Sequence, residues 1–503
     1  MPWPRAALLA ALLFLAKQLL VSGLTPALHA PDEQAHFDYV QRIAESGQLP
    51  RCETAGLLAS AGSWSPEVRA LLAGTVTPIA FHPERPLPTL PAGAIGGGPE
   101  ARLTDGCNYV TLYPPLYYQI AALGYRTAAA GTVWQRLFAA RLSGSLWGLL
   151  AVLSAFAAGV LFGGRSGDGL LLALLVILQP MASFLFGAVN SDGAVIACGS
   201  AAAAAVAWLW RRPLSAAPLA SLGACALAGA LSKPTFVLLL PWLALVALLV
   251  LGWRRPSSWL RLALALAPAA AVTLGWTWWM RGVYLSRAGA SESGPTLAGY
   301  LLELVSNPSR LYLVWVKLYW VGWGWVDVFL RPPAYLFLCG GLLASAIGAG
   351  FKLRGGSGPE RFALLWGATA TAGLLATLHL LEWRLLRRGE LAFVAGRYLL
   401  GLLVPHALMI VLGLRGLGER LSLGRDLAWA AVPALVLLDA AAELRCVARY
   451  TPAGSSRLAH AREVYQAFAP GWFEPALALH LLALLAALLL AARALARAPA
   501  QER

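Results

Sequence analysis

Blocks of apolar residues long enough to cross a lipid bilayer recur along almost the whole chain. Examples are Pro234 to Leu251, Leu262 to Met280 and Pro475 to Ala492, and a membrane span needs about 20 residues at roughly 1.5 Å rise each. Only 13% of the 503 residues are charged and 59% are hydrophobic, whereas a soluble domain carries about 25% charged residues. Much of the surface must therefore face lipid, which predicts an all-α, polytopic membrane protein.

The apolar blocks predict about twelve transmembrane helices, of which an uncleaved helix within residues 1–24 is the first. Residues 25–135 are too polar and too long for an ordinary connection, so we expect a large extracytoplasmic loop with interfacial helices there. Within it, 114–131 is interpreted as a helix on the membrane surface, although a span stays open. The multi-span domain, 136–503, should have its spans at 142–163, 168–187, 193–210, 215–231, 234–252, 258–280, 333–350, 362–380, 398–414, 427–443 and 475–493.

Basic residues gather in the connections that fall on one side of these spans. The positive-inside rule makes that side cytoplasmic, together with both termini, and places the opposite face, with loop 25–135, outside the cell. Loops 281–332, 381–397 and 444–474 are then extracytoplasmic. The net charge of +15 is explained by such short loops and by anionic lipid, and without zinc-finger spacing nucleic acid is not an expected partner.

The segment His29 to Val40, with the sequence HAPDEQAHFDYV, is the strongest local signal in the chain. Two adjacent carboxylates, Asp32 and Glu33, follow shortly after the first span. Pro31 fits the first position of a new helix, whose dipole would favour acids in the first turn. His36 would lie on the same face as Asp32. On spacing alone, a capped interfacial helix explains the pattern as well as a functional site does.

This segment resembles the acidic motif in the first extracytoplasmic loop of the GT-C superfamily of membrane glycosyltransferases, which take a sugar from a polyprenyl-phosphate carrier. Related motifs follow in order: Tyr113-Pro-Pro-Leu-Tyr-Tyr118, Val189-Asn-Ser-Asp192, Leu231-Ser-Lys-Pro-Thr235 and Gly396-Arg-Tyr398. The chain looks most similar to a bacterial Pro-Asp-Glu-x-x-His-Phe subgroup, related to the protein mannosyltransferase and aminoarabinose transferase branches. Unlike eukaryotic protein mannosyltransferases and oligosaccharyltransferases, it lacks a lumenal insert and a large soluble C-terminal domain.

The resemblance implies an inverting transferase in which Asp32 is the general base. Glu33 would orient Asp32 or bind the acceptor, and the two roles could be exchanged. Lys233 and Arg397 would hold the anionic phosphate. The candidate substrate-binding residues are His36, Tyr117, Asn190, Asp192, Lys233, Arg397 and Tyr398. No cofactor is required by this chemistry, and a divalent metal at the carboxylates stays open.

The implied donor is an undecaprenyl-phosphate-type sugar, and the implied acceptor is a cell-envelope glycan, a lipid or a protein. The lipid bilayer is the other expected partner, and the bacterial plasma (inner) membrane is the expected location. A lipid-linked glycan transporter or ligase is the alternative, although we find no paired hydrophobic repeats of the kind transporters show. An inactive membrane scaffold of the same fold is the third hypothesis.

Four further features of the sequence carry expectations of their own. The aromatic cluster between Trp315 and Trp325 predicts an interfacial belt or a sugar platform. Asp439 and Glu443 are expected to pair with Arg445 or Arg449. Lys17, inside the first span, is expected to extend toward the membrane surface, with a functional role as the alternative. Cys52 and Cys107 form a disulfide if their loop faces an oxidising compartment.

Overall fold

The computed structural model describes residues 1–50, 64–76, 98–104, 107–213, 215–281, 294–389, 394–423 and 426–496. Regular structure in this part of the chain is helical, apart from a single bridge between Trp323 and Val328. Ten of the described helices are long and apolar enough to cross a membrane. The prediction of an all-α, polytopic membrane protein is therefore confirmed.

The ten candidate spans follow the apolar blocks of the sequence, and three of them begin with a short 3-10 turn. They are α1 (Trp3–Leu24), α5 (Val133–Gly163), α8 (Asp192–Arg211), η4 with α10 (Pro234–Leu239, Leu240–Leu251), α11 (Pro256–Trp279), α16 (Pro332–Gly355), α17 (Gly358–Arg387), η6 with α18 (Gly396–Leu402, Leu403–Arg420), η7 with α19 (Leu427–Ala430, Ala431–Tyr450) and α21 (Phe473–Ala496).

Two of the twelve expected spans take another form. The segment 168–187 is broken into α6 (Ser166–Ile177) and α7 (Pro180–Phe186), which are bent by 73°. Pro180 lacks the N–H that would continue α6, so the helix stops before it. The segment 215–231 forms α9 (Ala216–Ala230), which at 15 residues is shorter than the other spans. The count is therefore ten long spans, or eleven with the broken pair.

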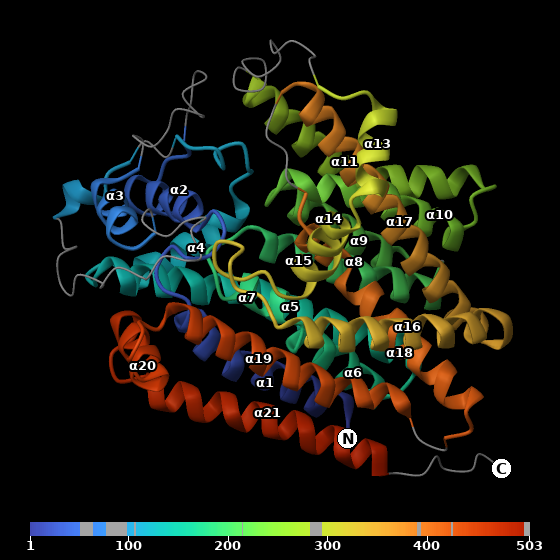
Figure 1. The fold of residues 1–503 in the computed structure, drawn as a ribbon. Helices are drawn as coiled ribbons and strands as arrows, with labels where there is room; N and C mark the ends of the chain where they lie inside the picture. Colours follow the sequence, from blue (N-terminus) through green and yellow to red (C-terminus); the bar gives the residue numbers. More distant parts are fainter. Residues whose placement is uncertain are drawn as a thin grey trace.

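The first loop folds into short helices above the end of α5. These are α2 (Glu33–Ser46), α3 (Pro66–Leu71), η2 (Leu72–Val76), η3 (Pro99–Arg102) and α4 (Leu116–Thr127). They lie together at the upper left of Figure 1. The α4 helix packs on α5 and α2 and is not a candidate span, which agrees with a surface position for 114–131. Arg126 closes this contact by donating to the carbonyl oxygens of Ile43 and Ala44.

The later loops also contain helices. The one before α16 holds α13 (Leu297–Ser306), α14 (Pro308–Leu311), η5 (Tyr312–Lys317) and α15 (Leu318–Trp320), and α20 (Arg457–Phe468) joins α19 to α21. Along the lower edge of Figure 1, α1, α19 and α21 run side by side, with α20 at one end. That end also holds the C-terminus of α1, because Tyr465 of α20 donates to the Leu19 carbonyl.

The aromatic cluster before α16 lies mainly in the protein core. Trp320 and Trp323 are buried, and Trp323 stacks on Phe184 with ring centroids 5.0 Å apart. The helix α7 packs against this segment and covers the two side chains. They are therefore neither part of an aromatic belt at the membrane surface nor an open platform for a sugar.

The expected ion pairs of α19 are wrong. Arg449 pairs with Asp327, and Arg445 donates to the Phe329 carbonyl. Asp439 and Glu443 face α1 and α21 instead, where Lys17 and His480 are their partners. Lys17 is therefore buried in an ion pair and does not extend to the membrane surface. Cys107 is disulfide-bonded, whereas Cys52 lies outside the described residues.

Candidate functional site

Asp32 occupies the N-cap position of α2 but does not cap the helix with its side chain. Its backbone is left-handed, with φ of 62°, which is uncommon for a residue other than glycine. One carboxylate oxygen accepts a hydrogen bond from Tyr109 Oη at 3.0 Å, and the other lies 3.4 Å from Arg397 Nη2. The side chain keeps 37% of its surface exposed. The simple helix-cap explanation of the acidic motif is therefore excluded, and α2 begins at Glu33, two residues later than Pro31 suggested.

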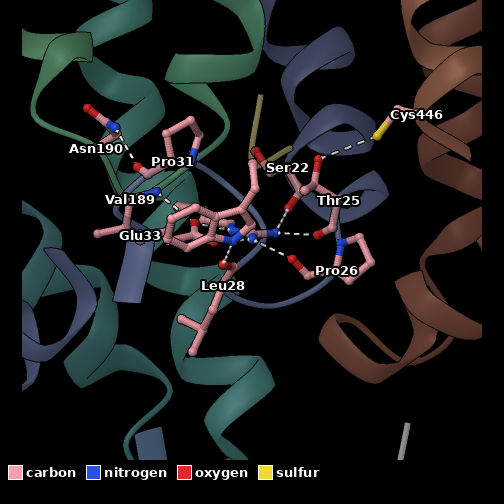
Figure 2. A network of polar contacts seen from close by, with 12 residues as sticks. Ser22, Thr25, Pro26, Leu28, Pro31, Glu33, Val189, Asn190 and Cys446 are labelled. Atoms are coloured by element: carbon pink, nitrogen blue, oxygen red, sulfur yellow. Dashed lines mark hydrogen bonds and ion pairs between the residues drawn. The ribbon is translucent and has the colours of Figure 1, made fainter. Parts of the chain in front are cut away.

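Arg141 of α5 fixes the loop that leads into Asp32. It donates to the carbonyl oxygens of Ser22, Thr25 and Pro26 at 2.8 to 3.1 Å. Further along the loop, the indole of Trp325 donates to the Leu28 carbonyl. Figure 2 shows the accepting residues of this loop, with Ser22, Thr25, Pro26 and Leu28 labelled. Because hydrogen bonds fix these carbonyl groups, the loop can keep a strained backbone conformation, which costs about 1–3 kcal/mol.

Glu33 has the opposite surroundings from its neighbour Asp32. It has no exposed surface and receives two hydrogen bonds from Arg141, at 2.7 and 2.5 Å. Its Oε1 also accepts from the backbone N–H of Val189, in the turn before α8. A carboxylate with this many fixed donors holds elements together and cannot receive a proton from a substrate without breaking the pair.

The turn Val189 to Asp192 connects this loop to α8. Asn190 donates from its side chain to the Pro31 carbonyl at 3.0 Å, and its backbone N–H donates to Tyr117 Oη at 2.8 Å. Its side-chain oxygen accepts from the backbone N–H of Asp192. Asn190 and Tyr117 thus brace the turn that presents Asp192.

Asp192, Lys233 and Arg397 continue the charged chain that starts at Asp32. Lys233 Nζ lies 2.7 Å from Asp192 Oδ1, and Arg397 Nε lies 3.3 Å from Asp192 Oδ2. Arg397 therefore bridges the two carboxylates, Asp32 and Asp192. We call these four side chains the charged cluster. They come from four segments that are as many as 365 positions apart in sequence.

Aromatic rings and a histidine surround the charged cluster. Lys233 Nζ lies 5.0 Å from the ring centroid of Tyr113 and 5.7 Å from that of Tyr398, within cation–π range. Burial opposes the charge on Lys233, but Asp192 outweighs it and raises the pKa of the ammonium. Burial also raises the pKa of Tyr113, to about 12. The site therefore presents a retained cation between the rings of Tyr113 and Tyr398.

His36 faces Tyr118 beside the charged cluster. Its Nδ1 lies 2.8 Å from Tyr118 Oη. Burial first, and the positive charge of Lys233 second, hold the pKa of His36 well below its usual value. His36 therefore stays neutral, and it contributes a hydrogen bond to the wall of the site.

A narrow crevice extends from the charged cluster toward the membrane domain. Asp192, Arg397 and Tyr398 form its polar end, and its apolar walls come from α8, η4 and α17. Its free space of about 10 Å³ has room for about one water molecule. A larger group can enter only if side chains move.

The structure brings most of the expected site residues together. Asp32, Asp192, Lys233 and Arg397 are joined by direct contacts, with Tyr398 and His36 beside them, while Glu33, Asn190 and Tyr117 lie behind the loop as supports. Sequence reasoning missed Tyr109 and Arg141. Arg141 carried a usable signal, because a charged side chain inside a long apolar helix is rarely without a partner.

The chain is a member of a family of membrane proteins. Residues 14–405 match the family described as "Predicted membrane protein (DUF2142)", so the chain belongs to it. No curated protein sequence matches the chain.

Some solved structures are similar to this chain at low sequence identity. The ArnT from Cupriavidus metallidurans in the apo state is 15% identical, with a TM-score of 0.43 over 95% of this chain and 75% of that one. The same protein bound to undecaprenyl phosphate gives 13% identity and 0.42, over 97% and 75%. The oligosaccharyltransferase of Archaeoglobus fulgidus gives 12% and 0.42, over 93% of this chain and 57% of its own length.

Proposed function

We propose that this protein is an inverting glycosyltransferase of the GT-C type, which moves a sugar from a polyprenyl-phosphate carrier to an acceptor outside the cytoplasmic membrane. One observation carries the proposal. Asp32, Asp192, Lys233 and Arg397, which belong to four separate motifs, meet in one charged cluster in which Asp32 remains partly exposed. The function of a transporter or of a scaffold would not require a partly exposed carboxylate held in a left-handed backbone conformation.

Asp32 acts as the general base in this proposal. The acceptor hydroxyl loses its proton to a carboxylate oxygen of Asp32 while its own oxygen attacks the anomeric carbon, and the bond from that carbon to the carrier phosphate breaks. Tyr109 and Arg397 orient the carboxylate by contacting one oxygen each. Glu33 is a positioning residue, because Arg141 and the Val189 N–H occupy its oxygens.

Arg397 and Lys233 stabilise the phosphate that leaves. Both cations are largely buried, so their charge acts in surroundings with little water, where electrostatic stabilisation is strongest. Asp192 holds both in place. A carrier phosphate would replace part of the contact of Asp192 with Lys233 and Arg397. The movement of these side chains would open the narrow crevice described above. The donor we propose is an undecaprenyl-phosphate-type sugar, and the acceptor is a glycan, a lipid or a protein.

The test compares three proteins in proteoliposomes supplied with a panel of polyprenyl-phosphate sugars and an extract of cell-envelope acceptors. Asp32→Asn keeps the shape of the side chain and tolerates the left-handed backbone, so we expect normal folding and a loss of at least about 100-fold in transfer. Glu303→Gln removes a carboxylate of the loop helix α13 that is 60% exposed, and it should transfer normally. Normal transfer by Asp32→Asn would overturn the general-base assignment.

A further inference from the structure

Three transmembrane helices bury four ionisable side chains that the proposed reaction does not use. α1 carries Lys17, α19 carries Asp439 and Glu443, and α21 carries His480. The helices are neighbours along the lower edge of Figure 1, and none of the four residues is more than 7% exposed. Ionisable groups inside a bilayer are costly and rarely without a role.

The four side chains form two contacts that lie close together. Lys17 Nζ is 2.6 Å from Asp439 Oδ2 and also donates to the Ile177 carbonyl of α6 at 2.8 Å. His480 Nε2 is 2.9 Å from Glu443 Oε2. Glu443 lies one helical turn after Asp439, so the two carboxylates face the same side of α19. Within the described residues, Asp439 Oδ1, Glu443 Oε1 and His480 Nδ1 are buried without a hydrogen-bond partner.

Other ionisable groups on the surrounding helices are occupied elsewhere. On α5, Arg141 is bound to Glu33, and on α6, Asp168 pairs with Arg415 at the opposite end of the bundle. On α19, Arg449 contacts Asp327. Lys17, Asp439, Glu443 and His480 must therefore balance their charges among themselves.

The four side chains Lys17, Asp439, Glu443 and His480 are electrically neutral together only if they bind one proton. With Lys17 charged, both carboxylates ionised and His480 neutral, the group carries one net negative charge. An uncompensated charge in the interior costs several kcal/mol, and a single bound proton removes it. Asp439, Glu443 and His480 are the three groups that can carry that proton, as a carboxylic acid or as an imidazolium.

We propose that Lys17, Asp439, Glu443 and His480 form a proton-binding site inside the membrane domain, and that the four side chains together hold one proton. With the proton bound, the site is neutral and joins α1, α19 and α21. Loss of the proton at alkaline pH leaves one buried negative charge at the contact of the three helices and weakens their packing. The ligand of this site is the proton, and the inference does not depend on glycosyl transfer.

The proton-binding site is connected to the loop that leads into Asp32. Cys446, one turn after Glu443 on α19, lies 3.8 Å from Thr25 Oγ1, and Arg141 holds the carbonyl of Thr25. Weaker packing of α19 on α1 therefore acts on the loop through Thr25 (Figure 2).

The first experiment is thermal unfolding of the full chain in lipid nanodiscs from about pH 6 to about pH 9. The wild type should lose melting temperature toward alkaline pH. Glu443→Gln should show no such loss, because Lys17 and Asp439 are neutral together without a proton. The matched control is Glu463→Gln, since His460 and Glu463 form a histidine–glutamate contact of 3.6 Å in which Glu463 is 80% exposed. It should follow the wild type, and equal alkaline slopes in the wild type and Glu443→Gln would refute the proposal.

A second pair of variants tests the charge count independently. Lys17→Met leaves two carboxylates and needs a second proton, so we expect little folded protein in the membrane. Adding Asp439→Asn to Lys17→Met removes that excess charge and restores neutrality with one proton, so the double variant should accumulate to clearly higher levels than the single. A double variant no better than Lys17→Met would show that net charge does not govern this site.

Discussion

Asp32 and Glu33 are neighbours in the sequence but serve different purposes because the backbone turns between them. The left-handed conformation of Asp32 directs its carboxylate to Tyr109 and Arg397, while Glu33, the first residue of α2, points back to Arg141. At the scale of single residues, the two carboxylates that sequence alone could have exchanged are therefore distinguished by exposure. The partly exposed one can meet a substrate, and the buried one cannot.

Glu33→Gln should destabilise the protein, because it leaves Arg141 charged and buried without its counter-ion. Removing one partner of a buried ion pair costs about 3–5 kcal/mol. The double variant Glu33→Gln with Arg141→Met removes both charges and should recover part of that loss, although the loop before Asp32 would still lack its carbonyl donors. Chemical denaturation in detergent micelles measures this. If the single variant is as stable as the wild type, Glu33 does not hold the loop.

His36 should make the protein acid-sensitive. Its pKa is held well below the usual value by burial and by Lys233, so near pH 6 the unfolded chain binds the proton more readily than the folded one. Stability should therefore be complete above about pH 6.5 and fall by about 1.4 kcal/mol per pH unit below it. Unfolding of the wild type and His36→Gln between about pH 7 and pH 5 measures the effect. The variant should lose this slope, and an unchanged slope would assign it to another group.

At the scale of helices, the position of Arg397 depends on a close approach between α8 and η6. A Cβ atom on Gly199 would come within 2.0 Å of the Gly401 carbonyl oxygen, whereas one on Gly193 of the same helix would meet nothing closer than 3.5 Å. Only a glycine at position 199 allows this backbone contact.

Gly199→Ala should therefore push η6 away from α8 and separate Arg397 from Asp192. We expect a loss of about 1–3 kcal/mol in stability from overpacking and a fall of about 100-fold in transfer. Gly193→Ala is the matched control in the same helix and should change neither. Thermal unfolding and the proteoliposome assay measure both effects. Equal behaviour of the two alanine variants would mean that the contact does not position Arg397.

Sequence predicted the elements that depend on local pattern. The apolar blocks located the spans, and the short motifs placed Asp32, Asp192, Lys233 and Arg397 at the ends of those elements, where the structure brings them together. It could not predict the partners of buried charges. The pair of Arg141 with Glu33 joins positions that are 108 residues apart, and no periodicity encodes such a distance. The break before α7 also depends on Gln179, whose side chain caps α7 and reaches the Tyr319 carbonyl.

At the scale of the whole molecule, the charged cluster lies near one end of the helix bundle and the contact of Arg415 with Asp168 lies at the other. The C-terminus of α1, the start of α8 and the helix α20 share the first end. The C-terminal part of α18, with Glu419 and Lys352, belongs to the second. The proposed function requires the first end to face outward. The positive-inside rule predicts the same orientation, because it assigns the basic connections to the cytoplasmic side.

Cysteine labelling tests this orientation. The background for this experiment replaces four cysteines by alanine: Cys198, Cys225, Cys339 and Cys446. In it, Glu463→Cys places a thiol on α20, at a position whose side chain is 80% exposed. Glu419→Cys places a thiol near the end of α18, at a position whose side chain is 63% exposed. A membrane-impermeant maleimide added to intact cells should label Glu463→Cys at once, and Glu419→Cys only after the membrane is opened. The reverse pattern would place the charged cluster on the cytoplasmic side, where an extracytoplasmic acceptor could not reach Asp32.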